Sequence, residues 1–192
     1  MARHVTLGFL IAGVSLLLLR VAMSQSAMQP LRLGDAFPQF SGQTITGETV
    51  ELPGATSGKV ALVVFSFSRA AGKDARSWNE HLFKDFSNSN FVTVPGYQII
   101  ELESVPKPFR AVAVASMRSA MPHAVQDRTI LVYQDEALWK QRLGANDDAH
   151  AYIILLGADG RIRWSNSASY SDSGYEQLKS AIEAQLQAHQ HD

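Results

Sequence analysis

The sequence feature that most constrains the fold is a strongly apolar run, Val60–Phe67, followed at once by an amphipathic segment. The run is rich in β-branched and aromatic residues, which is typical of a strand buried on both faces of a sheet. The apolar residues after it recur at intervals of three or four and predict a helix from about 72 to 86: Ala75, Trp78, Leu82 and Phe86. A buried strand leading into such a helix favours a sheet with crossover connections.

The middle of the chain continues the alternation of strands and helices. Gln43–Leu52 predicts a hairpin before the buried strand, and Tyr97–Glu103 predicts a second strand after it. Pro106 and Pro108 lie where a helix can start. That helix has one expected core face, made of Phe109, Val112, Ala113, Ser116, Met117, Ala120 and Met121.

The last third of the chain predicts a second hairpin between helices. Thr129–Tyr133 fits a short strand, and Asp135 is a candidate cap for a short helix through Leu143. Two further strands, Ala151–Leu156 and Arg161–Ser165, flank the turn residues Asp159-Gly160. Strict alternation in the last strand would place Ile162 and Trp164 on one face, and a terminal helix is expected over 174–188. The predicted class is α/β: a mixed central sheet flanked by helices in three layers, with an N-terminal β-hairpin extension.

The N-terminus predicts a targeting segment. Arg3 and His4 precede the apolar stretch Val5–Leu19, and small residues follow at Ala22 and Ser24, as in a secretory signal peptide over 1–24. The apolar stretch is shorter than the ~20 residues that span a bilayer. We therefore expect export to the periplasm or another extracytoplasmic compartment. An uncleaved N-terminal anchor, or a mitochondrial presequence with an inner-membrane or matrix location, stays open.

The remaining domain organisation is simple. Residues 25–40 are an expected extended lead-in, 41–188 the folded domain and 189–192 a tail.

Composition excludes several functions. The chain contains no cysteine, so it has no thiol chemistry and no disulfides. Its net charge of −1 does not suggest a nucleic-acid binder, which needs a concentrated basic surface. It also lacks a phosphate-binding loop, a zinc-ligand spacing and a glycine-rich dinucleotide fingerprint. No cofactor is predicted.

Three segments resemble the thioredoxin-like superfamily, especially its peroxiredoxin-like branch: Leu33–Pro38, Gly58–Phe65 and Ile153–Ile162. The resemblance implies a thioredoxin-like sandwich. In that branch the reactive cysteines fall within a segment matching Arg69–Ala75, and a proline precedes the late hairpin strand. This chain has neither, because the latter segment is His150-Ala151-Tyr152. Both departures are those expected of a non-redox descendant.

A narrower resemblance is to the mitochondrial ATP synthase assembly factor family called "ATP ten". Phe67-Ser68-Arg69 with Gly72 and Trp78 is similar to its strand-to-helix signature, and Asn146, Tyr152 and Ile162-Arg163-Trp164 are similar to its C-terminal pattern. The family implies a cysteine-poor thioredoxin-like fold and a non-catalytic assembly or chaperone role toward a membrane-sector subunit.

The first candidate site is the helix start Ser68–Lys73. Unpaired N–H groups and a partial positive charge at a helix N-terminus favour an anion, and Arg69, Lys73 and Arg76 would add charge beside Gly72. The alternative is an ordinary helix start with solvated side chains. The second candidate is Trp164 as an interface anchor, with Arg161 and Arg163 exposed nearby, and the alternative for Trp164 is core packing. Tyr152 is a further partner-binding candidate, from the family pattern.

Other chemistry has weaker support in the sequence. Ser66 or Ser68 as a nucleophile would need a base, and Ser77, His81 and Asp127 are not placed together by any pattern. Possible metal ligands are Met117, Met121, His123, His189 and His191. The two methionines fit core packing better, so no metal is predicted.

These observations predict a redox-inactive, exported thioredoxin-like protein that binds another protein as an assembly factor or chaperone for a membrane or envelope complex. The alternative is a cysteine-independent enzyme or a protein that binds a small anion or ligand. Enzymatic activity is not expected. The expected partner is a protein subunit, with membrane contact through the N-terminal segment if it is uncleaved.

Overall fold

The computed structural model describes residues 29–86 and 94–189. The predicted targeting segment 1–24 and most of the connection Asn88–Pro95 lie outside the described residues. From Leu31 onward the chain forms one compact unit. None of the described helices is long and apolar enough to cross a membrane.

A seven-stranded mixed sheet forms the centre of this unit, in the order β2-β1-β5-β4-β3-β6-β7. The central strands β3, β4 and β5 are parallel, whereas β1, β2, β6 and β7 pair with their neighbours in antiparallel fashion. The strands are β1 Phe40–Thr44, β2 Thr49–Leu52, β3 Ala61–Ser66, β4 Gly96–Glu101, β5 Thr129–Val132, β6 Tyr152–Leu156 and β7 Ile162–Asn166. The predicted α/β class and mixed sheet are confirmed.

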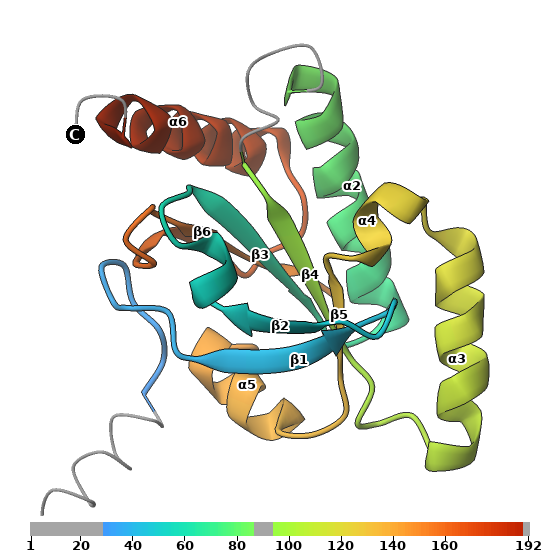
Figure 1. The fold of residues 1–192 in the computed structure, drawn as a ribbon. Coiled ribbons are helices and arrows are strands. Elements are labelled where there is room, and N and C mark those ends of the chain that lie inside the picture. The colour runs from blue at the N-terminus through green and yellow to red at the C-terminus, as the bar shows by residue number, and fades with distance from the viewer. Residues whose placement is uncertain (1–28, 87–93, 190–192) are drawn as a thin grey trace, which may run out of the picture. The chain divides into compact units, whose positions relative to one another are not determined.

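Helices cover both faces of the sheet, which makes three layers (Figure 1). On one face, α2 (Arg69–Phe86) and α6 (Asp172–His189) bury Trp78 and Leu178 against Val64. On the other face, α5 (Glu136–Leu143) buries Trp139. The remaining helices are α3 (Lys107–Ala120), the short α4 (His123–Gln126) and the 3-10 turn η1 (Gly54–Thr56).

The strand β3 is buried on both faces, as its apolar run predicts. Val63 and Phe65 contact the core around α5, while the alternate residues Leu62 and Val64 contact the core under α2 and α6. Phe65 lies 4.9 Å from Trp139 between ring centroids. This one strand therefore joins the two cores.

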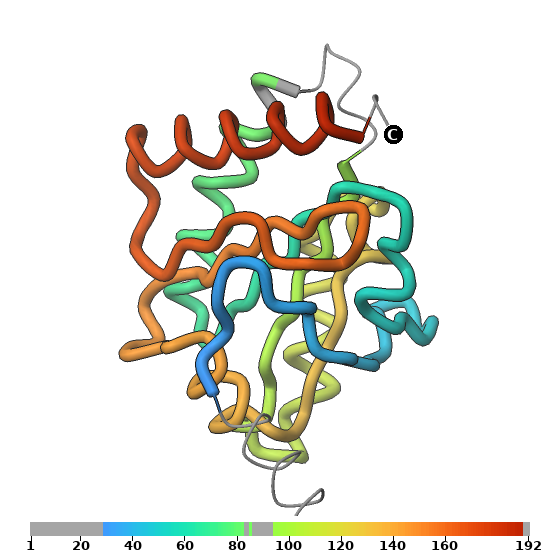
Figure 2. Tube along the Cα trace, turned by 90° about the vertical axis from the view of Figure 1, so that its left-hand side faces the viewer, coloured from blue at the N-terminus to red at the C-terminus, as the bar shows by residue number. Residues whose placement is uncertain are grey.

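The lead-in is fastened to the free edge of the sheet (Figure 2). Gly34 donates a backbone hydrogen bond to Ile162 of β7 at 2.8 Å, and Ile162 donates to Asp35 at 2.9 Å. Phe37 then buries its ring 6.1 Å from that of Trp139. The lead-in thus extends the sheet and also closes the core around α5.

A β-bulge corrects the predicted alternation in β7. Leu155 pairs with Trp164 but Leu156 pairs with Ile162, so Arg163 is the extra residue. Ile162 consequently packs into the core around α5, and Trp164 packs against the opposite core. The prediction that Ile162 and Trp164 share a face is wrong, because strict alternation fails at a bulge.

Two helix predictions also need correction. In the predicted core face of α3, Phe109 and Val112 are 63% and 68% exposed, and Ser116 and Ala120 are exposed as well. The predicted Met117 and Met121 do pack against the core, and Val114 packs there with them. Asp135 does not cap α5 with its side chain.

The helix α2 starts at Arg69, earlier than the predicted 72. Ser68 explains the difference, because its Oγ accepts a hydrogen bond from the Ala71 N–H at 3.1 Å.

Candidate functional site

The candidate site lies where β3 ends and α2 begins. Phe65 of β3 pairs with Tyr152, the first residue of β6, so Ser68 and Tyr152 lie at the same end of these two strands. In thioredoxin-like redox proteins this end of the strands holds the reactive cysteines and the proline loop, by the resemblance stated above. Here the corresponding positions hold the start of α2, directly after Ser68, and the loop 144–151 before β6.

The hydroxyl of Ser68 ties the start of α2 to that loop. It accepts from the Ala71 N–H and donates to the backbone carbonyl of Asp148. Tyr152 fastens the same loop from the other side, because its hydroxyl donates to the Asp147 carbonyl at 2.8 Å. Both hydroxyls are therefore committed to structural hydrogen bonds.

Asp74, one turn into α2, holds two more connections. Its carboxylate accepts from the Ala151 N–H at 3.0 Å and from the Tyr170 N–H at 2.9 Å. One side chain thus fixes the loop before β6 and the segment before α6 to the same helix.

Lys140 completes the attachment of the loop. Its ammonium lies 2.7 Å from Asp148 Oδ1 and 2.6 Å from Glu136 Oε1, and 5.4 Å from the centre of the Phe67 ring. Hydrogen bonds to Asp148 and then Glu136 raise the pKa of Lys140. Burial raises the pKa of Tyr152, which therefore stays a neutral donor.

A carboxylate cluster adjoins this network. Oxygen atoms of Glu101, Glu103 and Glu136 all lie within 4.8 Å of one another. Glu101 is 6% exposed, and its Oε1 accepts from the N–H groups of Leu102 and Glu103. Burial, opposed by these hydrogen bonds, raises the pKa of Glu101 to about 7.

The spacing of these three carboxylates is the only one among the described residues that is compatible with a metal ion. Two features oppose this use. Lys140 already neutralises Glu136, and Glu103 Oε2 accepts from the Glu136 N–H at 2.9 Å, which caps α5 in place of Asp135. The cluster is better suited to hold a proton than a cation.

The first turns of α2 face solvent. Arg69, Lys73 and Arg76 are exposed, and none of them forms an ion pair with any residue that the structure describes. A Cβ added at Gly72 would meet no atom within 4 Å, so the helix start borders open space. The predicted anion-binding residues are thus accessible, although Ser68 itself is engaged.

The second predicted set is divided. Tyr152 lies beside Ser68, but Arg161 adjoins the other end of β6, four residue steps of about 3.3 Å away. There Arg161 donates to the Gly34 carbonyl at 2.8 Å, and Arg163 donates to Asp159 at 2.7 Å. Trp164 is half-buried, with its ring centroid 6.2 Å from that of Trp78. The structure does not bring these residues into one surface with Tyr152.

No nucleophile with a base occurs among the residues considered for one. His81 Nδ1 contacts the Ser77 carbonyl at 2.9 Å, not its hydroxyl, and the His81 ring stacks on Tyr170. Asp127 pairs with Arg128 instead. Ser66 is buried and its Oγ has no hydrogen-bond partner in the described structure.

Sequence reasoning missed Asp74, Lys140 and Asp148. The pair Asp147-Asp148 offered a signal, since it lies in the predicted loop just before the strand Ala151–Leu156. That strand pairs with β3, which leads into the site. Asp74 gave none, because its partners Ala151 and Tyr170 are 77 and 96 residues away in the chain. Lys140 did offer one, because Glu136 lies four residues before it on the predicted helix.

Comparison with known proteins agrees with this geometry. The chain is similar to solved structures that cover 79–81% of it. One is described as the thiol:disulfide interchange protein DsbE of Chlorobium tepidum, with 15% identity, 99% of that chain covered and a TM-score of 0.58. Another is the thioredoxin domain of a thiol-disulfide oxidoreductase from Bacteroides vulgatus, with 19% identity, 99% of that chain covered and a TM-score of 0.53.

A third structure, BsSco, a member of the Sco family of cytochrome c oxidase assembly proteins, gives 17% identity, 97% coverage of that chain and a TM-score of 0.53. These likenesses establish the thioredoxin-like fold. No curated protein matches the sequence closely enough to count as a relative.

One family is matched over most of the chain. The sequence model described as "ATP10 protein" matches residues 25–184, which include β1 to β7 and most of α6. This confirms the resemblance to the ATP ten family. The chain belongs to the ATP10 family and has a thioredoxin-like fold without cysteines.

Proposed function

We propose that this protein is an assembly factor that binds a subunit of a membrane complex and performs no thiol chemistry of its own. Its family resemblance indicates the ATP synthase as that complex. The observation that carries the proposal is the ATP10 match over residues 25–184. An assembly-factor role needs protein partners and no redox centre.

The contacts at the start of α2 support this role. Ser68 occupies the start of α2 and donates to the Asp148 carbonyl, and the loop before β6 is fixed by Tyr152, Asp74 and Lys140. A substrate disulfide needs an attacking thiolate, and this chain has no cysteine to supply one.

The cavity beside Tyr152 is smaller than a typical small-molecule site. Its volume is about 80 Å³, with Leu143, Ile162 and Asn166 among its lining residues. Small-molecule sites typically occupy about 300 Å³ or more. This cavity therefore does not support a small substrate beside Tyr152.

The location belongs to the same proposal. The family match favours the alternative of a mitochondrial inner-membrane or matrix location over export. The targeting role of residues 1–24 and the domain limits 41–188 stay predictions, which N-terminal sequencing of the mature protein would test.

The experiment is co-purification of the full chain from detergent-solubilised membranes, with partners quantified by mass spectrometry. We expect one membrane-complex subunit to be enriched at a fixed ratio to the bait. Repeated recovery of no such subunit would overturn the proposal.

A second candidate function is anion or small-ligand binding at the start of α2. The observation that favours it is the exposure of Arg69 and Lys73 without ion pairs in the described structure, beside the open space at Gly72. The double variant Arg69→Gln/Lys73→Gln separates the two functions. Loss of phosphate binding with co-purification intact would favour the ligand-binding role, and loss of co-purification would place the partner at this helix end.

A further inference from the structure

A serine, a histidine and an aspartate lie in contact, and the network described above does not use their side chains. Ser169 Oγ is 2.6 Å from His150 Nδ1, and His150 Nε2 is 3.6 Å from Asp147 Oδ2. The histidine and the aspartate belong to the loop before β6, whereas the serine belongs to the segment between β7 and α6. A nucleophile, a base and an orienting carboxylate in this order form the arrangement that activates serine hydroxyls in hydrolases.

The contacts indicate where the imidazole ring carries its proton. A carboxylate accepts hydrogen bonds and donates none, so Asp147 beside Nε2 favours the tautomer with the proton on Nε2. Nδ1 then carries the lone pair that accepts from the Ser169 hydroxyl. Ser68 and Tyr152 differ, because their hydroxyls donate to backbone carbonyls. An imidazole nitrogen can take up a hydroxyl proton, whereas a carbonyl oxygen cannot.

Asp74 holds the histidine and the serine at their spacing. Its two carboxylate oxygens accept from the Ala151 N–H and the Tyr170 N–H at 3.0 and 2.9 Å. These are the residues directly after the histidine and the serine. One side chain therefore positions both members of a pair that lies 19 residues apart in the chain.

The arrangement is accessible from solvent. Ser169 is exposed, and the side chains of His150 and Asp147 are 30% and 51% exposed. Asp147 Oδ1 accepts from the Ala149 N–H at 2.8 Å, which leaves Oδ2 for the ring. An acyl donor can therefore reach Ser169 Oγ without movement of the fold, and water can reach it afterwards.

The backbone beside the serine limits the class of substrate. The N–H groups of Ala168 and Tyr170, on either side of it, already donate to the side chains of Asn166 and Asp74. They are thus not free to stabilise the oxyanion that forms when a carbonyl is attacked, which is usually the largest contribution to such catalysis. Amides need that stabilisation more than esters with a good leaving group do, so an activated ester is the expected substrate.

We propose that Ser169 is a nucleophile that accepts acyl groups from activated esters, with His150 as its base and Asp147 as the residue that orients the base. The bond from Oγ to the acyl carbon forms as the bond to the leaving oxygen breaks, and the hydroxyl proton passes through Nδ1 to that oxygen. Water then attacks the acyl-serine, its proton passes through Nδ1 back to Oγ, and a carboxylic acid is released. This activity goes beyond the assembly role and does not rest on it.

The test uses the full chain and p-nitrophenyl acetate. Release of p-nitrophenolate gives the rate, and mass spectrometry of the digested protein gives the site of acetylation. We expect acetylation of Ser169 to precede that of every other serine in the wild-type chain. This mapping needs no variant, so it does not depend on how a variant folds.

Two substitutions remove the reacting groups. Ser169→Ala and His150→Gln should each lower the rate at least about tenfold, because glutamine keeps an acceptor for the hydroxyl but is not a base. The matched control is Ser167→Ala, which alters an exposed serine two residues earlier and should leave the rate unchanged.

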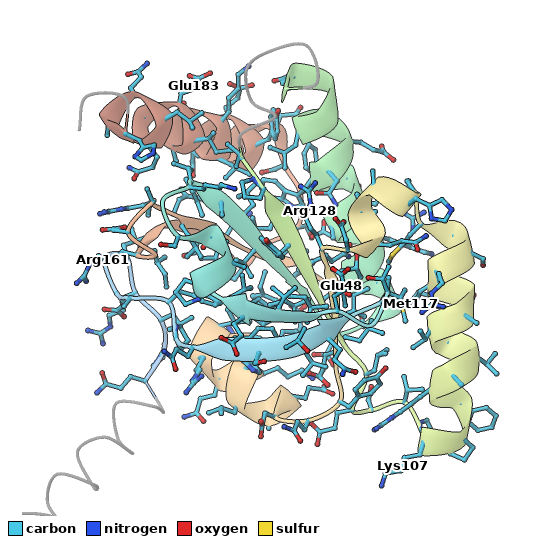
Figure 3. The ribbon with its side chains drawn as sticks, in the orientation of Figure 1. Glu48, Lys107, Met117, Arg128, Arg161 and Glu183 are labelled. Carbon is cyan, nitrogen blue, oxygen red and sulfur yellow. The ribbon has the colours of Figure 1, made fainter. Side chains whose placement is uncertain are left out.

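A third position tests the orienting carboxylate. Asp147→Asn should lower the rate of acylation, and Asp147→Glu should recover part of it, because the carboxylate acts through the imidazole. The matched control is Glu183→Gln, an exposed carboxylate on α6 (Figure 3), which should leave the rate unchanged.

Several results would overturn the inference. These are the absence of acetyl-Ser169 in the wild-type chain, equally fast acetylation of other serines, or a wild-type rate in the Ser169→Ala or His150→Gln chain. Circular dichroism confirms that each variant is folded.

Discussion

Replacing Glu101 by glutamine should make the protein more stable at pH 8 and leave its stability nearly unchanged near pH 4.5. Glu101 is buried at the end of β4, beside the carboxylates of Glu103 and Glu136. Burial is the largest cause of its raised pKa, about 7 against an ordinary 4.5. Glutamine keeps the oxygen that accepts from Leu102 and Glu103 and removes the ionisable group.

The sign follows from proton binding. Between pH 4.5 and 7 the folded state holds the Glu101 proton while the unfolded state has lost it, so stability falls as pH rises through this window. A shift from 4.5 to about 7 corresponds to about 3 kcal/mol. The glutamine variant does not incur this cost, so its advantage should grow to about 3 kcal/mol at pH 8.

The assay is urea unfolding of wild type and variant at several pH values from 4.5 to 8. The difference between them cancels the titration of groups that they share. Glu183→Gln, an exposed carboxylate on α6, is the matched control and should give a difference near zero throughout. A Glu101→Gln chain that is no more stable than wild type at pH 8 would refute the reasoning.

Substitutions at three further positions test the contacts around the site by urea unfolding. Ser68→Ala should cost about 1 kcal/mol, because it removes the cap of α2 and the hydrogen bond to the Asp148 carbonyl; an unchanged midpoint would contradict that role. Asp74→Ala should cost about 3 kcal/mol, because two backbone N–H groups lose a charged acceptor, and Asp74→Asn, which keeps one acceptor, should cost less. Trp139→Ala should cost about 4 kcal/mol by emptying the core around α5, and a loss below about 1 kcal/mol would mean that this core is not packed as described.

Local pattern was sufficient to predict the centre of the fold. The apolar run Val60–Phe67 predicted β3, because a doubly covered strand has no polar face. Asp159-Gly160 predicted the late hairpin, and Gly160 has the positive φ of 72° that its turn needs. These features depend on residues that are neighbours in the chain.

Tertiary contacts decided the features that pattern missed. The bulge at Arg163 separates Ile162 from Trp164, and no local signal distinguishes a bulged strand from a regular one. The predicted apolar stripe of α3 is present, but of its residues Met117 and Met121 pack against the core, together with Val114. Part of the stripe therefore faces outward, where a sequence pattern alone assigns it to the core.

The site likewise combines features that the sequence indicates with features that only tertiary contacts determine. Ser68 and Tyr152 are candidates by the family resemblance, and the fold places both where β3 ends and β6 begins. Asp74 meets the N–H groups of Ala151 and Tyr170 only because the fold brings together segments 77 and 96 residues apart in the chain.

The most direct test of an assembly role is the amount of intact complex in membranes of cells that lack this protein. We predict that native gels will show depleted ATP synthase with accumulated subcomplexes, and that the wild-type chain will restore the intact form. Normal levels of assembled ATP synthase in the deleted cells would contradict the role.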